Sequence, residues 1–88
     1  MFVENLTSSK GNPLANQFIL KDDDGDTYFQ SYATMIVKLA KDGSVMLDKD
    51  AWDYNNTSSK YRNIFLNETT KETKAKIESG EYALTYLN

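Results

Sequence analysis

Four aspartates surround a glycine in the front half of the chain and are the first candidates for chemistry. Several convergent carboxylate oxygens are what a calcium ion requires. The spacing does not match an EF-hand loop, because with Gly25 at the sixth position Leu20 would stand at the first ligand position and Ser31 at the last. We therefore expect no metal site and interpret the segment as a solvated hairpin tip. The four residues are Asp22, Asp23, Asp24 and Asp26.

The same tip, together with two tyrosines that follow it, is a candidate surface for binding another protein. Residues 1–30 carry five acidic side chains against two lysines, so this part of the chain is acidic. Such a surface suits a basic partner, although a net charge of −3 is small for a protein that works only by imitating DNA. The predicted partner-binding residues are Asp22, Asp23, Asp24, Asp26, Tyr28 and Tyr32.

A second candidate surface combines aromatic and basic residues in the back half of the chain. Aromatic rings stack on nucleobases and Lys or Arg side chains neutralise phosphates, so this combination suits single-stranded nucleic acid. The competing interpretation is that Trp52, Ile64 and Phe65 form a helix-on-sheet core and that the lysines are an ordinary solvated face. The predicted nucleic-acid-binding residues are Trp52, Tyr54, Lys60, Tyr61, Arg62, Lys71 and Lys74.

Most enzyme mechanisms need residue types that this chain lacks. Its 88 residues include no cysteine and no histidine, which removes thiolate nucleophiles, the commonest general base and the usual transition-metal ligands. Asp48, Asp50 and Asp53 cluster in the sequence, but a chain this short has little volume for a cleft around paired carboxylates. The sequence contains no Gly-rich phosphate-binding motif and no G-x-S-x-G motif. We expect a protein that is not an enzyme and takes no cofactor.

Charge and hydropathy indicate where the protein works. The sequence pI of about 4.8 gives no overall attraction to anionic lipid. The first residues lack the cationic lead and apolar run of a signal peptide, and no stretch approaches the ~18 apolar residues of a membrane span. We expect a cytoplasmic protein with no membrane partner.

Turn-forming residues divide the chain into the elements that must position these candidates. Residues 1–15 are polar and contain a Gly/Pro breaker cluster, which predicts a flexible N-terminal arm ahead of a single domain over residues 16–88. Two segments rich in aromatic and β-branched residues flank the acidic tip and predict a hairpin. Helices are expected over about residues 58–66 and 70–79, the second with a capping box and a stop at Gly80. Residues 82–87 read as a final extended segment.

Residues 33–42 fit either a helical stripe or an alternating strand. The Asp42-Gly43 dipeptide favours a two-residue type I′ turn, which would place Leu39 opposite Met46 in a hairpin, so we favour the strand. The expected fold is α+β, with a small antiparallel β-meander of about four strands, two short C-terminal helices and the final extended segment.

Short aromatic and polar segments are spread over the chain from Asn12 to Asn88. They are Asn16-Gln17-Phe18, Tyr28-Phe29-Gln30-Ser31-Tyr32, Leu47-Asp48, Trp52-Asp53-Tyr54, Ser59-Lys60-Tyr61-Arg62-Asn63, Phe65-Leu66, Thr70-Lys71-Glu72-Thr73 and Ser79-Gly80-Glu81-Tyr82. Together they resemble a family of short uncharacterised proteins from bacteriophages and prophages of Gram-positive bacteria. That family has no assigned activity, cofactor or catalytic residue, so the resemblance implies a phage origin and supplies no site residues.

The missing catalytic residue types and the phage resemblance lead to one hypothesis. The protein is expected to be a phage accessory protein that binds a host or anti-phage-defence protein stoichiometrically and modulates it, in host takeover or anti-defence. The alternative is a small module that binds single-stranded DNA or RNA through the aromatic-basic residues. A virion component is a third class, and exposed strand edges leave a homodimer open.

Overall fold

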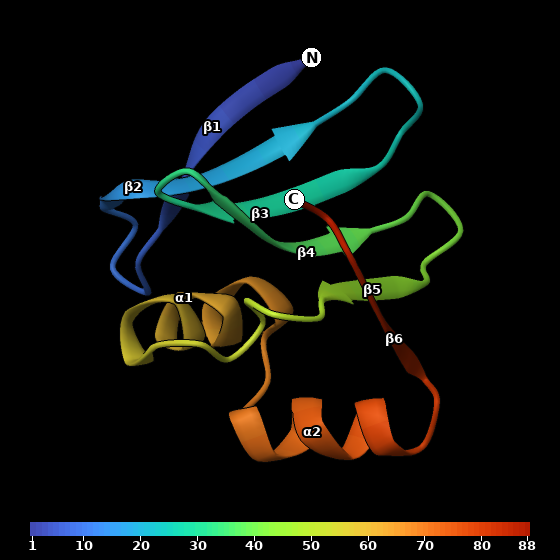
Figure 1. The fold of residues 1–88 in the computed structure, drawn as a ribbon. Coiled ribbons are helices and arrows are strands. Elements are labelled where there is room, and N and C mark those ends of the chain that lie inside the picture. The colour runs from blue at the N-terminus through green and yellow to red at the C-terminus, as the bar shows by residue number, and fades with distance from the viewer.

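A six-stranded sheet forms one layer of the molecule, and two helices form a second layer on one side of it (Figure 1). The structure is a computed structural model that describes all residues from 1 to 88. This α+β architecture agrees with the predicted fold class, with six strands where about four were expected. The elements in chain order are β1 (Phe2–Thr7), β2 (Pro13–Lys21), β3 (Thr27–Ser31), β4 (Thr34–Leu39), β5 (Val45–Asp48), α1 (Asn56–Leu66), α2 (Thr70–Glu78) and β6 (Tyr82–Thr85).

The order of strands in the sheet follows the order in the chain. Strands β1 to β5 form an antiparallel meander, and β6 pairs with β5 in parallel. A parallel neighbour requires a long crossover, which the two helices provide. The last strand therefore returns to the sheet only after the helical layer has been built.

Strand β1 corrects the expectation of a flexible arm over residues 1–15. Phe2 lies opposite Lys21 and Asn5 opposite Phe18, so the segment is paired along β2. Leu6 is buried in the core. The other β1 side chains are exposed and need not be apolar, which is why the sequence of this strand has no regular apolar pattern. The Gly/Pro cluster after it forms a hairpin loop.

Three hairpin loops, β1–β2, β2–β3 and β4–β5, share one hydrogen-bonding pattern. In the β4–β5 loop the N–H of Gly43 donates to the carbonyl oxygen of Ala40 at 2.9 Å. Gly43 has φ of 91°, whereas its predecessor has no positive φ, so this is a three-residue loop and not the predicted two-residue type I′ turn. The extra residue shifts the register by one, and Leu39 pairs with Val45 instead of the predicted Met46.

Residues 34–39 form β4, which confirms the strand over the helix. The register with β3 shifts after Phe29, so that Ile36 is an extra residue in β4. Ile36 and Val37 are both fully buried. A β-bulge interrupts the strict alternation of a strand, and this is why the sequence of this segment also fits a helical pattern.

The helices cover the sheet face that carries Phe29, Val37 and Leu47. The ring of Phe65 in α1 stacks on Phe29 with centroids 5.7 Å apart. The predicted capping box begins α2, with each backbone N–H of the Thr69–Glu72 pair bonded to the other residue's side chain.

The chain after β6 crosses the end of β5 and reaches β4 (Figure 1). The side-chain amide of Asn88 accepts from the backbone N–H of Met35 at 2.8 Å and donates to its carbonyl oxygen at 2.9 Å. Neither helix has the length and apolar character needed to cross a membrane.

Candidate functional site

The acidic tip between β2 and β3 uses its carboxylates to shape its own turn. The side chain of Asp22 accepts hydrogen bonds from the backbone N–H groups of Asp24 and Asp26, each at 3.0 Å, and from the Tyr28 hydroxyl at 3.1 Å. These bonds, led by the one from Asp26, lower the pKa of Asp22 below its usual value of 3.8. Asp26 accepts from the backbone N–H of Lys41 at 2.9 Å. The tip therefore holds its negative charges in a defined turn.

Two carboxylates of the tip point to solvent. Asp23 bonds only the N-terminal amine of Met1, at 3.0 Å, and its side chain is 94% exposed. Asp24 makes no side-chain hydrogen bond or ion pair. No group of three carboxylates is arranged to hold a metal ion. The tip thus presents exposed negative charge and no ligand cage.

Tyr28 and Tyr32 lie at opposite ends of β3. The ring of Phe29 faces the helices, so Tyr28 points to the opposite face, beside the acidic tip. Tyr32 follows the strand at the turn into β4, with φ of 54°. The four strand positions between the two tyrosines correspond to about 14 Å. The structure joins Tyr28 to the predicted partner-binding tip and separates Tyr32 from it.

Arg62, the central base of the predicted nucleic-acid surface, is enclosed, with 0% of its side chain exposed. Its guanidinium lies 5.1 Å from the Trp52 ring centroid and donates to the Trp52 carbonyl oxygen. It also donates to Asn63 Oδ1 at 3.0 Å and Thr70 Oγ1 at 2.8 Å, and it lies 3.3 Å from the Asp53 carboxylate. These contacts join the loop before α1 to both helices, so Arg62 is out of reach of a phosphate.

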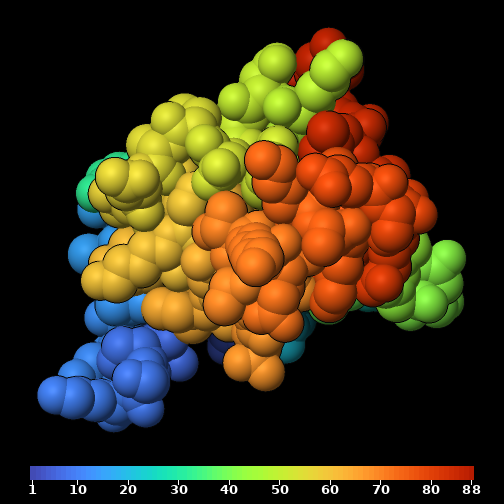
Figure 2. All heavy atoms as spheres, turned by 90° about the horizontal axis from the view of Figure 1, so that it is seen from below, coloured from blue at the N-terminus to red at the C-terminus, as the bar shows by residue number.

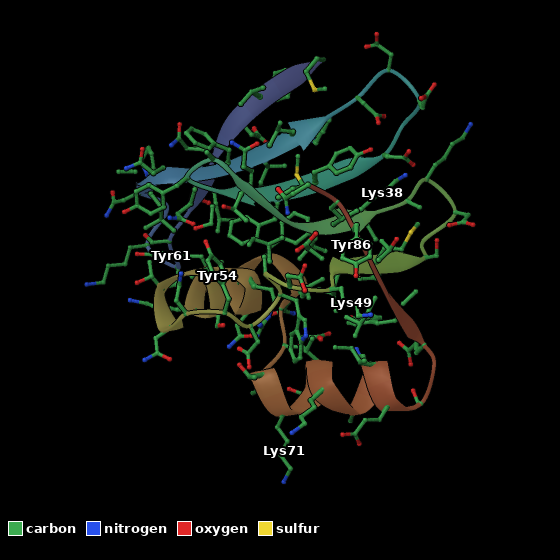
Figure 3. All side chains as sticks on the ribbon, in the orientation of Figure 1. Lys38, Lys49, Tyr54, Tyr61, Lys71 and Tyr86 are labelled. Atoms are coloured by element: carbon green, nitrogen blue, oxygen red, sulfur yellow. The ribbon has the colours of Figure 1, made fainter.

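The other members of that set lie on different surfaces. Tyr61 packs against the core, with the Lys60 amine 5.5 Å from its ring centroid. Tyr54 is exposed, as are Lys71 and the neighbouring Lys74 on α2. Figure 3 places Tyr54 and Tyr61 beside α1 and Lys71 on the outer side of α2. The predicted aromatic-basic residues do not form one continuous platform.

Glu68, between the two helices, is a buried carboxylate that sequence reasoning missed. Its side chain is 4% exposed and accepts from Thr73 Oγ1 at 2.5 Å, the Tyr82 hydroxyl at 2.7 Å and Lys76 Nζ at 2.9 Å. Burial acts to raise the pKa of Glu68, but these three hydrogen bonds outweigh it and lower the pKa below the usual 4.5. The hydrogen bond to Glu68 also raises the pKa of Lys76. Its partners come from α2 and β6, so no local sequence pattern marks this residue.

Asp48, from the predicted carboxylate cluster, is the other buried acid, with 3% of the residue exposed. One carboxylate oxygen accepts from the backbone N–H of Ala51 at 2.9 Å, and the other accepts from that of Leu87 at 2.8 Å. Burial acts to raise the pKa of Asp48, yet the hydrogen bonds, led by that from Leu87, lower it. Asp48 fixes the turn after β5 and the C-terminal chain, and has no free oxygen for acid–base work.

A polar hollow of about 610 Å³ lies between the β1–β2 loop and the junction of the two helices (Figure 2). Ser8, Asn63 and Asn67 are among the residues that line it. Its two carboxylates are already engaged, Glu72 in the α2 capping box and Glu68 in the network with Tyr82. The hollow lacks a free acid–base pair.

The sheet face away from the helices carries a strip of apolar side chains. Residues paired across neighbouring strands lie side by side on one face. One such row takes a single residue from each strand: Val3, Leu20, Tyr28, Lys38, Met46 and Ala83. A second row contains Phe18, Gln30 and Met35. The apolar members, here termed the open-face strip, are Val3, Phe18, Leu20, Tyr28, Met35 and Met46.

Neither helix lies on the open-face strip, and the C-terminal residues reach it only at Met35, whose backbone bonds the Asn88 side chain. Val3 is 54% exposed, and the other five members are half-buried by their neighbours. Lys38 crosses the strip with its amine 5.8 Å from the Tyr28 ring centroid and 3.7 Å from the Asp26 carboxylate. At the border near the C-terminal residues, the Lys49 amine lies 5.8 Å from the ring centroid of the exposed Tyr86 (Figure 3).

One feature of the sequence, an apolar run in β2, indicates this strip. Phe18, Ile19 and Leu20 are consecutive apolar residues within one strand. Ile19 packs on the core, so its neighbours on either side must face the other way. An uninterrupted apolar run is typical of a strand with apolar surroundings on both faces.

Comparison with known proteins places the chain in a family. The model of a family of unknown function (DUF8033) matches residues 1–81. The chain belongs to this family. No curated protein and no solved structure matches it. The matched residues include the whole open-face strip and the acidic tip.

Proposed function

We propose that this protein is a non-enzymatic bacteriophage accessory protein that binds a host or anti-phage-defence protein and modulates it, most simply by inhibition. The observation that carries the proposal is the open-face strip. A cluster of apolar side chains that the helices leave uncovered is typical of a protein interaction site. Here it lies beside a pre-organised acidic tip, so one surface combines apolar area with charge.

The fate of the polar side chains supports a binding role over a catalytic one. Asp48, Arg62 and Glu68 are enclosed charged groups, and each makes hydrogen bonds to neighbouring elements of the fold. A general acid or base needs a free position within hydrogen-bond reach of a substrate. These residues act in stability, which leaves the surface for function.

The phage part of the proposal rests on the sequence segments that resemble short phage and prophage proteins. A small protein without catalytic equipment acts on a larger target by occupying it, in a one-to-one complex. A standard interface of about 800 Å² per partner is a sizeable share of the surface of a domain this small.

Nucleic-acid binding is the second candidate, and it is less well supported. Arg62 is enclosed, and the exposed Lys71 of α2 lies away from Tyr54 (Figure 3). The net charge of −3 opposes an overall attraction to phosphates. Nucleic-acid binding is therefore one of the outcomes that the test below distinguishes.

The test is affinity capture from a Gram-positive host lysate with three forms of the protein. They are the wild type, Met46→Glu in the open-face strip, and Ile64→Glu as a matched control on α1, where Ile64 is 40% exposed. We expect the wild type and Ile64→Glu to retain one host protein at a one-to-one ratio by native mass spectrometry. Met46→Glu should lose it, because a charge would be buried in an apolar contact.

Equal capture by the wild type and Met46→Glu would refute the open-face strip as the site. Absence of any captured protein, with salt-sensitive binding to single-stranded DNA by the wild type, would favour the nucleic-acid alternative. Circular dichroism and thermal melting of both variants establish that each is folded.

A further inference from the structure

The shape and charge of the open-face strip define the partner that fits it. We infer that the strip accepts an amphipathic helix of another protein, with its apolar side on the strip and basic residues toward the hairpin tips. This inference deepens the proposed function and rests on it, since it names the chemistry of the partner at the same surface.

The residues of the strip suit an apolar and adaptable contact. Met35 and Met46 are two of the three methionines of the chain. Methionine is flexible and polarizable, and methionine-rich surfaces accept apolar side chains of varied shape. The ring of Tyr28 is held by the hydrogen bond from its hydroxyl to Asp22, so it presents a fixed aromatic surface beside them.

The dimensions of the strip match one helix. Strands lie about 4.8 Å apart, so the strip, which runs across five strands, is about 19 Å long, and two rows on one face are about 7 Å apart along the strand. A helix with side chains is about 10 Å wide and rises 1.5 Å per residue, so about 13 residues cover the strip.

A second copy of the chain is a poorer occupant than a helix. Packing two sheets face to face would cover the polar neighbours of the strip as well, including Gln30 and the Lys38–Asp26 pair. Burial of polar groups without new partners is costly. A single helix covers a narrower part of the sheet: it lies over Gln30, but the Lys38 amine and its Asp26 partner at the tip stay in water.

Charge at the hairpin tips sets the polarity of the partner. The β2–β3 and β4–β5 loops lie at the same end of the meander, because successive strands are antiparallel. Residues 22–26 and 40–44 carry five aspartates and one lysine. Beyond the loops, only Lys38 and the N-terminal amine pair with these carboxylates. A helix lying beside the tips is therefore favoured when Lys or Arg faces them.

The experiment uses three synthetic 18-residue peptides as probes: an ideal amphipathic Leu/Lys helix, the same helix with Glu for Lys, and a scrambled Leu/Lys peptide. The full-length protein carries ¹³C-methyl methionine, whose three signals are assigned by substitution. We expect the Leu/Lys helix to bind one-to-one and to shift the Met35 and Met46 signals. The Glu peptide and the scrambled peptide should bind at least tenfold more weakly.

Variants separate the apolar contribution from the charge contribution. Met46→Glu should weaken the Leu/Lys helix at least tenfold, with Ile64→Glu unchanged. Asp24→Lys at the tip should weaken it about threefold at low salt, whereas Asp50→Lys, beyond the other end of β5, should have no effect. The Asp24 side chain makes no hydrogen bond or ion pair, so that variant tests mainly its charge.

Three outcomes would overturn the inference. The first is that the Met35 and Met46 signals do not shift, and the second is that the scrambled or Glu peptide binds with equal affinity. The third is that the signals shift with protein concentration and that sedimentation shows a dimer. These results do not decide the proposed function. If the wild type captures a host protein and Met46→Glu does not, the strip is still a protein interface, but for a partner that is not a helix. Conversely, loss of capture with specific peptide binding would refute the phage target and retain the helix-binding surface.

Discussion

Arg62→Met is the substitution that most directly separates a structural arginine from a nucleic-acid-binding one. Methionine keeps a long unbranched side chain but removes every donor. The carbonyl oxygen of Trp52 and the side chains of Asn63 and Thr70 would lose their bonds to the guanidinium. We expect the variant to be strongly destabilised.

The size of the effect follows from the burial of the group. Removing one partner from a buried ionic network typically costs about 3–5 kcal/mol. The Asp53 side chain is 42% exposed and regains water, which places the expected loss at the lower end, about 3 kcal/mol. A domain of this length has about 4–13 kcal/mol of stability. The loss corresponds to a fall in Tm of about 12–24 °C.

Urea unfolding followed by tryptophan fluorescence measures this loss, because Trp52 is the single tryptophan and lies against Arg62. Lys60→Met is the matched control, since Lys60 is an exposed base on the same helix and should change stability by less than about 0.5 kcal/mol. If Arg62→Met leaves the free energy of unfolding unchanged but weakens binding of single-stranded DNA, the structural role of Arg62 is wrong and the aromatic-basic surface regains support.

Three further substitutions test the other structural assignments. Glu68→Gln removes a carboxylate whose pKa in the folded protein lies below its usual 4.5. The stabilisation by this carboxylate is therefore present above pH 4.5 and is lost as pH falls through the folded pKa. In urea titrations the variant should be about 1–3 kcal/mol less stable than the wild type at pH 7, and this difference should narrow toward pH 3. Gly43→Ala places a Cβ at φ of 91° and should cost about 1 kcal/mol, measured by thermal melting, whereas no change would mean that the loop does not hold residue 43 at a positive φ. Asp48→Asn should raise the amide hydrogen-exchange rate of Leu87 at least tenfold, and an unchanged rate would show that Asp48 does not hold the C-terminal chain.

Local sequence signals located most of the elements because their causes are local. The capping box before α2 and the glycine after it define that helix within about one residue. The acidic turn likewise marks the β2–β3 hairpin, because Asp and Gly tolerate the backbone angles that the turn needs. The strand β1 was missed, since only Leu6 among its side chains reaches the core.

The candidate sites were harder to predict, because the type of a residue does not determine whether its side chain is exposed. Arg62 and Lys60 look equivalent in sequence, yet one is enclosed and the other is solvated. Which one turns inward depends on Trp52, Thr70 and Asn63 arriving from different elements. No pattern within a single helix contains that information.

The sequence alone determined the class of molecule: a small α+β domain without the side chains that catalysis usually requires. Only the tertiary structure decided which surface is left open. A one-residue change of register reverses the face of every side chain in a strand, and the hairpin loop and the β4 bulge both set that register. These two features place Met35 and Met46 on the face opposite the helices, where Phe18 also lies.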